Sequence, residues 1–222
     1  MNFRKLFDFL RLLNTEGNNN KVWIDKNRAY YEEVRDEYIA FLNALNQELQ
    51  AVHEDYHPTT GKKAINRINN NKLYQPNKPT YKDHFGAALD QAKEQADFYI
   101  HLGINGSFLA GGFYHANNEQ LKKIRSAIDY DGEKLIEIIN APEFKKYFGD
   151  LMRDDSLVNA PKGYSTEHPH IDLLKLKSFV VIHDLTQKEI IASGFKEELI
   201  KAYKLMLPFR QYLNKAVSFE ED

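Results

Sequence analysis

Residues 98–115, FYIHLGINGSFLAGGFYH, carry the pattern of a β-hairpin. Every second residue from 98 to 102 is apolar, and aromatic or polar residues lie between them, which is typical of a strand with one buried face. Residues 103–106 contain glycine and asparagine, the residue types that tight turns favour. Residues 107–115 then form the second arm. The hairpin predicts an antiparallel sheet in the middle of the chain.

Helical patterns lie on both sides of this hairpin. Apolar residues recur every three to four positions over residues 3–13, 30–52 and 199–216, with charged residues between them. In the last of these segments Pro208 predicts a kink or a break, because proline lacks an amide hydrogen and clashes with the preceding turn.

Two shorter segments complete the predicted architecture. Residues 178–183, SFVVIH, are rich in β-branched residues and predict a central strand, and residues 64–68 favour a short strand. We therefore expect an α+β fold in a single domain spanning residues 1–222. Its largely antiparallel central sheet is covered by long N- and C-terminal helices.

The composition excludes several classes of protein. The chain has 222 residues, of which 42% are hydrophobic, so it can bury a sizeable core. It has no cysteine, which excludes disulfides, thiolate metal sites and cysteine nucleophiles. A net charge of -2 argues against general nucleic-acid binding. No run approaches the ~18 apolar residues of a membrane span, and we predict a cytoplasmic protein.

The basic loop, residues 61–82, departs from this balance. Its sequence, GKKAINRINNNKLYQPNKPTYK, contains six lysines and arginines and no acidic residue. Arg67, Lys78 and Lys82 are candidates for binding a phosphate or carboxylate, since arginine offers a bidentate fork and lysine a point charge. Tyr81 is a candidate for stacking on a ring or donating its hydroxyl. The competing interpretation is a solvated loop whose charges meet nearby carboxylates.

Two adjacent glycines, Gly111 and Gly112, interrupt the second arm of the hairpin. Such a pair allows a ligand or another backbone to come close, and Tyr114 just beyond it would help to orient a ligand. The alternative is a β-bulge or a crowded contact within the sheet. The pattern of a nucleotide-binding phosphate loop, with a Lys-Ser or Lys-Thr pair after its glycines, is absent.

A polar loop with two histidines, residues 161–172, has the sequence PKGYSTEHPHID. An extended backbone here would place His168 and His170 on the same side. With Glu167 or Asp172 they would form a metal site of the histidine and carboxylate type. The other interpretation is a loop whose histidines are simply hydrogen-bonded.

Several segments together resemble the family called domain of unknown function 2461. They are the opening FDFLRLLNTEGNNNKVWIDKNRAYY, the basic loop from Arg67 to Lys82, the strand FLAGGFY, and the sequence PKGY followed by His168 and LLKLKSF. The resemblance covers essentially the whole chain in order. It implies one domain, in a family of bacteria and fungi, and no particular mechanism. It adds Lys162 and His168 to the candidate ligand-binding residues.

Three functions compete at this point. We expect a binding protein for a small anionic or polar ligand, which the basic loop holds and Tyr81 or Tyr114 orients. The first alternative is a hydrolase or transferase with His168 or His101 as general base, with or without a metal. The second is a protein-interaction module whose basic loop meets an acidic partner. An anion site needs only donors and positive charge, which are visible, whereas a catalytic site needs a matched nucleophile and base, which are not.

Overall fold

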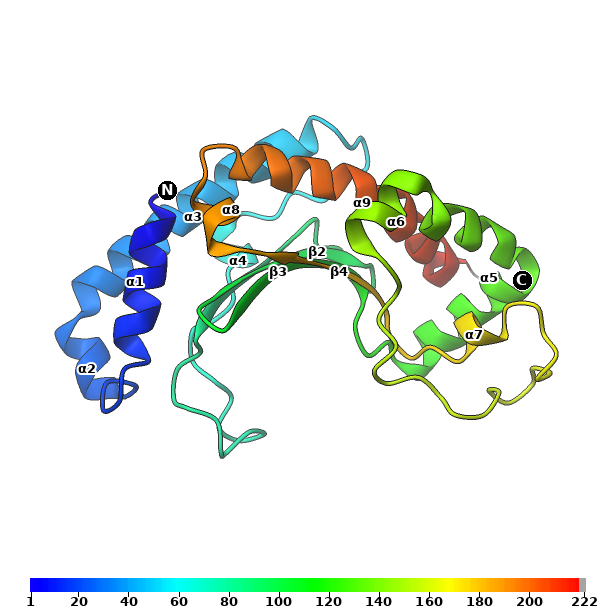
Figure 1. Ribbon diagram of the computed structural model, residues 1–222, viewed down its shortest axis with the longest axis horizontal. Coiled ribbons are helices and arrows are strands. Elements are labelled where there is room, and N and C mark those ends of the chain that lie inside the picture. The colour runs from blue at the N-terminus through cyan, green and yellow to red at the C-terminus, as the bar shows by residue number, and fades with distance from the viewer. Residues whose placement is uncertain (220–222) are drawn as a thin grey trace. The chain divides into compact units, whose positions relative to one another are not determined.

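The computed structural model describes residues 1–219 and contains one four-stranded sheet (Figure 1). The strands are antiparallel, and they follow one another across the sheet in chain order. They are β1 (His84–Leu89), β2 (Asp97–Gly103), β3 (Gly106–Phe113) and β4 (Phe179–Leu185). The predicted α+β fold is confirmed, and the predicted hairpin is β2 and β3.

Helices precede, interrupt and follow the strands. They are α1 (Phe3–Leu13), α2 (Lys21–Lys26), α3 (Arg28–Gln50), α4 (Gly61–Ala64), α5 (Asn118–Asn140), α6 (Pro142–Phe148), α7 (Ile171–Leu174), α8 (Gln187–Ile191) and α9 (Phe195–Ser218). The long amphipathic helices predicted near the two ends are α3 and α9.

Side-chain caps fix where two of these helices begin. Before α5, the Asn117 side chain accepts a hydrogen bond from the Gln120 amide at 2.9 Å, and the Gln120 side chain accepts one from the Asn117 amide at 3.0 Å. Thr186 and Glu189 form the same reciprocal box before α8. Each box satisfies backbone amides that have no partner within the helix.

Two local expectations are corrected. Residues 64–68 do not form a strand, because Lys63 and Ala64 donate to the Thr60 carbonyl at 2.8 Å and close the helical turn α4. The extended backbone that follows makes isolated bridges from Ile65 to Ala87 and from Asn69 to Tyr81. At Pro208 a kink or a break was expected, and the break is excluded because α9 continues through this residue.

The described chain divides into two compact units. The first contains residues 1–90, 99–109 and 184–201, and the second contains residues 91–98, 110–183 and 202–219. Strands β2, β3 and β4 each pass from one unit into the other along the chain. That the chain forms one domain stays a prediction.

In the first unit, α1 and α3 cover one face of β1. The ring of Phe85 lies 6.2 Å from that of Phe9 on α1 and 6.0 Å from that of Tyr38 on α3. All three side chains are buried, and burying an aromatic or aliphatic side chain of this size contributes roughly 1.5–3 kcal/mol. Because successive residues of a strand point to opposite faces, this packing turns His84 towards the other face of the sheet.

In the second unit, α9 packs against the start of β2 and against α6. Phe98 and Tyr203 meet edge to face with their ring centroids 5.5 Å apart, and Phe144 lies 5.9 Å from Phe209. The Arg210 side chain is buried among them, and two of its nitrogens donate to the Ala96 carbonyl at 3.1 and 2.7 Å.

The buried hydroxyl of Tyr38 supports a first prediction. Within residues 1–219 this hydroxyl has no hydrogen-bond partner, and burial raises the pKa of Tyr38 above its ordinary value. Without the hydroxyl, the folded protein no longer bears the cost of burying a polar group that has no partner. Tyr38→Phe should therefore leave stability unchanged or raise it by about 1 kcal/mol.

Tyr56→Phe is the matched control for urea unfolding followed by circular dichroism. The Tyr56 hydroxyl donates to the Asn46 side chain at 2.9 Å, so its removal should cost about 1 kcal/mol. A Tyr38→Phe protein that loses as much stability as the Tyr56→Phe protein would show that the Tyr38 hydroxyl is satisfied in solution.

Candidate functional site

Three stacked rings cross β1, β2 and β3 on the sheet face that α1 and α3 leave open. His84 and His101 lie with their ring centroids 3.9 Å apart and 27° between their planes, and His101 and Phe108 are 4.4 Å apart at 10°. All three side chains are half-buried. We call these residues the ring column. Neighbouring strands place such side chains side by side, so the column follows from the register of the sheet.

Tyr99 borders the ring column because Gly86 leaves room for it. A β-carbon on Gly86 would overlap the Tyr99 hydroxyl and would lie 3.0 Å from the side-chain nitrogen of Asn66. The Tyr99 hydroxyl in turn lies 3.4 Å from Nδ1 of His101, and its ring centroid lies 6.1 Å from that of Phe108. Glycine at position 86 therefore lets the Tyr99 hydroxyl reach the ring column.

Asp83 orients the first imidazole of the column. Its Oδ1 lies 2.9 Å from Nδ1 of His84, and its Oδ2 accepts a hydrogen bond from the Asn105 side chain at 2.8 Å. Burial alone would raise the pKa of Asp83, but the hydrogen bonds from His84 and Asn105 hold it below its ordinary value. An ionised Asp83 requires the proton of neutral His84 on Nδ1, which leaves the Nε2 lone pair as an acceptor.

The two histidines of the column are neutral at pH 7. Burial, together with a smaller effect of the neighbouring His84, lowers the pKa of His101 to about 4. Burial likewise lowers the pKa of His84, against the opposing effect of Asp83. The positive charge of Lys82 contributes to the lowered pKa of both histidines, and that of Lys78 contributes at His84.

The basic loop is therefore close enough to act on the ring column. Within residues 1–219, neither Arg67 nor Lys78 has an ion-pair partner, and both side chains are exposed. The Lys82 side chain is held in place, because its Nζ donates to the Arg67 carbonyl at 2.8 Å. Burial lowers the pKa of Lys82. Lys78 and Lys82 thus act on an uncharged, half-buried group of rings.

Hydrogen bonds order the basic loop. Some lie within the loop, and others come from Asn19, between α1 and α2. Asn19 accepts from the Tyr81 amide at 2.8 Å and donates to the Tyr81 carbonyl at 3.1 Å. The Lys72 ammonium donates to the carbonyls of Pro76 and Lys78 and so closes the tip. An ordered loop loses less conformational entropy when it binds a ligand.

The four ligand-binding candidates of the first unit lie in this loop. Lys78 and Lys82 act on the histidines of the ring column, and Arg67 meets Lys82 through its backbone carbonyl. The ring of Tyr81 is instead buried, with 6% of the residue exposed, so its face is covered by protein. Their assignment to a ligand stays a prediction.

The candidates of the second unit have other neighbours. A β-carbon on Gly111 would overlap the Met206 sulfur, and one on Gly112 would overlap the Phe179 carbonyl oxygen. The glycine pair is therefore closely approached by α9 and β4. Tyr114 and Lys162 are exposed.

His168 uses both of its ring nitrogens within the second unit. Its Nδ1 accepts from the His170 amide at 3.0 Å, and its Nε2 lies 2.9 Å from Oδ1 of Asp129. Nε2 therefore carries the proton, and Nδ1 has no lone pair left for a general base in this conformation. Over the described residues, no group of three or more histidine and acidic side chains is arranged to hold a metal ion.

A serine, a histidine and an aspartate also meet in the second unit, at the start of β4. The Ser178 hydroxyl donates to Oδ2 of Asp155 at 2.9 Å and accepts from the His115 amide at 2.9 Å. Nδ1 of His115 lies 3.0 Å from the same Oδ2. In a nucleophilic triad the serine proton goes to the imidazole, whereas here it goes to the carboxylate, and Ser178 is completely buried. These contacts connect the residue before β4 to His115 and Asp155 in two loops.

Comparison with known families agrees with the resemblance seen in the sequence. The family described as conserved hypothetical protein (DUF2461) matches residues 5–212. The chain belongs to the DUF2461 family. A search of curated proteins and a search of solved structures gave no match. The matched range of this DUF2461 chain contains the whole ring column and the whole basic loop.

Between residues 1 and 219, no helix combines enough length with enough apolar character to cross a bilayer.

Sequence reasoning missed Asp83, His84, Gly86 and Phe108 in this DUF2461 chain. One signal was present, because residues 84–89 alternate apolar and small or polar side chains, as a half-buried strand does. The stacking of His84 on His101 depends on strand register between residues 17 positions apart, and no local pattern records it.

Proposed function

We propose that this DUF2461 protein binds a small anionic ligand between the basic loop and the ring column. The observation that carries the proposal is electrostatic: the charges of Lys78 and Lys82 act on the pKa of the same imidazoles that form the column. This effect supports a site at which the cations of the loop and the rings of the sheet meet the same ligand. A phosphate, sulfate or carboxylate group is the ligand chemistry that such a place favours.

Each part of the site has a distinct role. Arg67 and Lys78, exposed and without ion-pair partners among residues 1–219, supply charge that a ligand can neutralise. The ring column presents aromatic edges, which carry partial positive charge, and imidazole nitrogens that can hydrogen-bond. Tyr99 adds a hydroxyl 3.4 Å from His101.

Removing the two free cations tests the proposal. Calorimetric titration at low ionic strength with sulfate and with pyrophosphate should give saturable binding to the wild-type protein. The double variant Arg67→Gln/Lys78→Gln should bind about tenfold more weakly, because each partly exposed charge contributes up to about 1 kcal/mol.

A matched control lies in the same loop. Lys62 and Lys63 on α4 are exposed, and Lys62→Gln/Lys63→Gln changes the net charge by the same amount. We expect this control to bind within about twofold of wild type when the salt concentration is held fixed. Equal losses in the two double variants would mean that only overall charge matters and that no defined site exists.

Asp83 and His84 favour a second candidate function, a hydrolase or transferase with a histidine base. The carboxylate fixes the imidazole tautomer and leaves Nε2 able to accept a proton, which is the arrangement of a general base. Turnover of p-nitrophenyl phosphate or p-nitrophenyl acetate that is abolished by His84→Gln would support it. Turnover that is unchanged by His84→Gln would exclude His84 as the base.

A further inference from the structure

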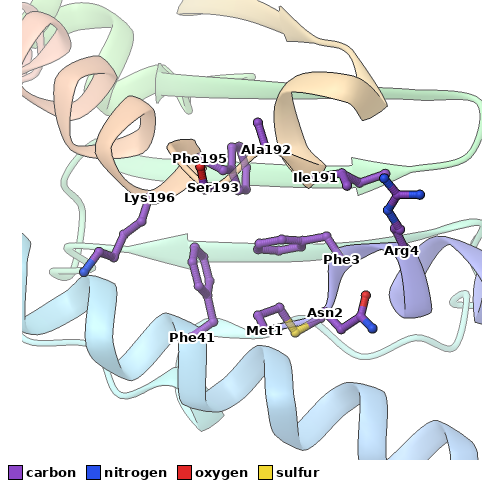
Figure 2. A pocket seen from close by; sticks show the side chains of 10 residues that line it. All are labelled: Met1, Asn2, Phe3, Arg4, Phe41, Ile191, Ala192, Ser193, Phe195 and Lys196. Carbon is purple, nitrogen blue, oxygen red and sulfur yellow. The ribbon is translucent and has the colours of Figure 1, made fainter.

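A cavity of about 440 Å³ lies in the first unit, away from the basic loop (Figure 2). Its walls come from the beginning of α1, from Phe41 on α3, and from the connection between α8 and α9. Pockets that bind small molecules typically have volumes of roughly 300–1,000 Å³. The cavity is therefore large enough for a compact organic ligand.

One wall of the cavity is a cluster of three phenylalanines. Phe3 meets Phe41 and Phe195 edge to face, with centroid separations of 5.0 and 5.1 Å and interplanar angles of 85° and 90°. Phe41 and Phe195 are parallel within 5°. Phe3 and Phe195 are buried, so these contacts hold the rings in place without a ligand. Phe41, in contrast, is half-buried, so the wall is preformed and the Phe41 ring is the part of it that a ligand can reach.

The charged residues that line the cavity are both basic. They are Arg4 and Lys196, which Figure 2 shows on opposite sides of the phenylalanine cluster. Lys196 has an ion-pair partner in Glu48, 2.7 Å away. Arg4 has no ion-pair partner among residues 1–219. An uncompensated guanidinium beside an aromatic wall is complementary to a carboxylate that is attached to an apolar ring.

We propose that this cavity binds a small aromatic carboxylate. Arg4 pairs with the carboxylate through its fork of donors, and the Phe41 ring, held in place by Phe3 and Phe195, packs against the aromatic body. Lys196, already paired with Glu48, contributes to the positive potential and not to a second fixed contact. This site shares no residue with the anion site of the basic loop.

The probe for the test is 4-phenylbutyrate, with 4-phenylbutylamine as a probe of the same shape and opposite charge. Binding to the full chain is measured by ligand-observed NMR and calorimetry at low ionic strength. The wild-type protein should bind the carboxylate saturably and not the amine. Arg4→Gln should weaken binding at least about tenfold, since a charge-assisted hydrogen-bonded pair is lost.

Two further variants separate this site from general effects of charge and fold. Lys188→Gln removes an exposed lysine on α8 that does not line the cavity, and binding should stay within about twofold of wild type. Ala192→Trp places a large side chain at an exposed position of the lining and should abolish binding of 4-phenylbutyrate while leaving sulfate binding intact. If that variant does not fold, Ser193→Trp takes its place. Equal binding of acid and amine, or undiminished binding in Arg4→Gln and in the tryptophan variant, would overturn the proposal.

Discussion

Replacing Gly112 with alanine should destabilise the protein by about 3 kcal/mol or more. Gly112 has φ +120°, a region that side chains rarely tolerate, and strain of this kind costs roughly 1–3 kcal/mol. A β-carbon there would also overlap the backbone carbonyl of Phe179 on β4 and lie 3.2 Å from the Phe209 ring. Backbone cannot yield as a side chain can, and overpacking adds roughly 1–3 kcal/mol.

Two other glycines of β3 separate strain from overlap. Gly106 has φ +144°, but a β-carbon added there would have no neighbour within 4 Å, so Gly106→Ala should show the cost of strain alone. At Gly111 a β-carbon would overlap the flexible end of Met206, so Gly111→Ala combined with Met206→Ala should recover part of what Gly111→Ala loses. Urea unfolding followed by circular dichroism measures the unfolding free energy of each of these variants. A Gly112→Ala protein within about 1 kcal/mol of Gly106→Ala would contradict the close approach of β4.

Acidification should destabilise the folded protein between pH 6.5 and pH 4 through His101. Burial lowers the pKa of His101 to about 4 in the folded state, against 6.5 when unfolded. Between these values the unfolded state binds a proton that the folded state does not, so stability is full above pH 6.5 and falls as the pH decreases towards 4. The shift corresponds to at most about 3 kcal/mol, and partial exposure of the ring reduces the expected loss to roughly 2 kcal/mol.

His101→Phe isolates this contribution from the carboxylates that titrate in the same range. Phenylalanine keeps the stacking on Phe108, whose ring is 4.4 Å away and nearly parallel, but it cannot take up a proton. The difference in unfolding free energy between pH 7 and pH 4 should therefore be roughly 2 kcal/mol smaller in this variant than in wild type. The same loss in both proteins would show that His101 titrates normally in the folded state.

The parts of the fold that sequence predicts are those set by local patterns. The hairpin of β2 and β3 follows from strict alternation at residues 98–102 and from turn residues immediately after it. The cap before α5 follows from Asn117 and Gln120, three residues apart. Residues 64–68 were mistaken for a strand because the turn that ends there is imposed by Gly61. That glycine packs on α3 and donates to the Asn43 side chain at 2.7 Å.

The site was predicted less completely because most of it depends on distant residues. The absence of acidic residues marks the basic loop in the sequence itself. Nothing local shows that Asn19, 62 residues away, fixes the backbone of Tyr81. A close approach at Gly111 and Gly112 was one of the two interpretations of that pair, but the approaching groups, Met206 and Phe179, could not be named from sequence.

The central claim is that the basic loop and the ring column form one anion site, and imidazole NMR during a sulfate titration tests it most directly. Sulfate keeps its charge throughout the pH range in which histidine titrates, and His84→Gln and His101→Gln assign the two signals. Bound sulfate stabilises the protonated imidazole, so the signals of His84 and His101 should shift saturably and the pKa of His101 should rise from about 4. Unmoved signals and an unchanged pKa at saturating sulfate would contradict the claim.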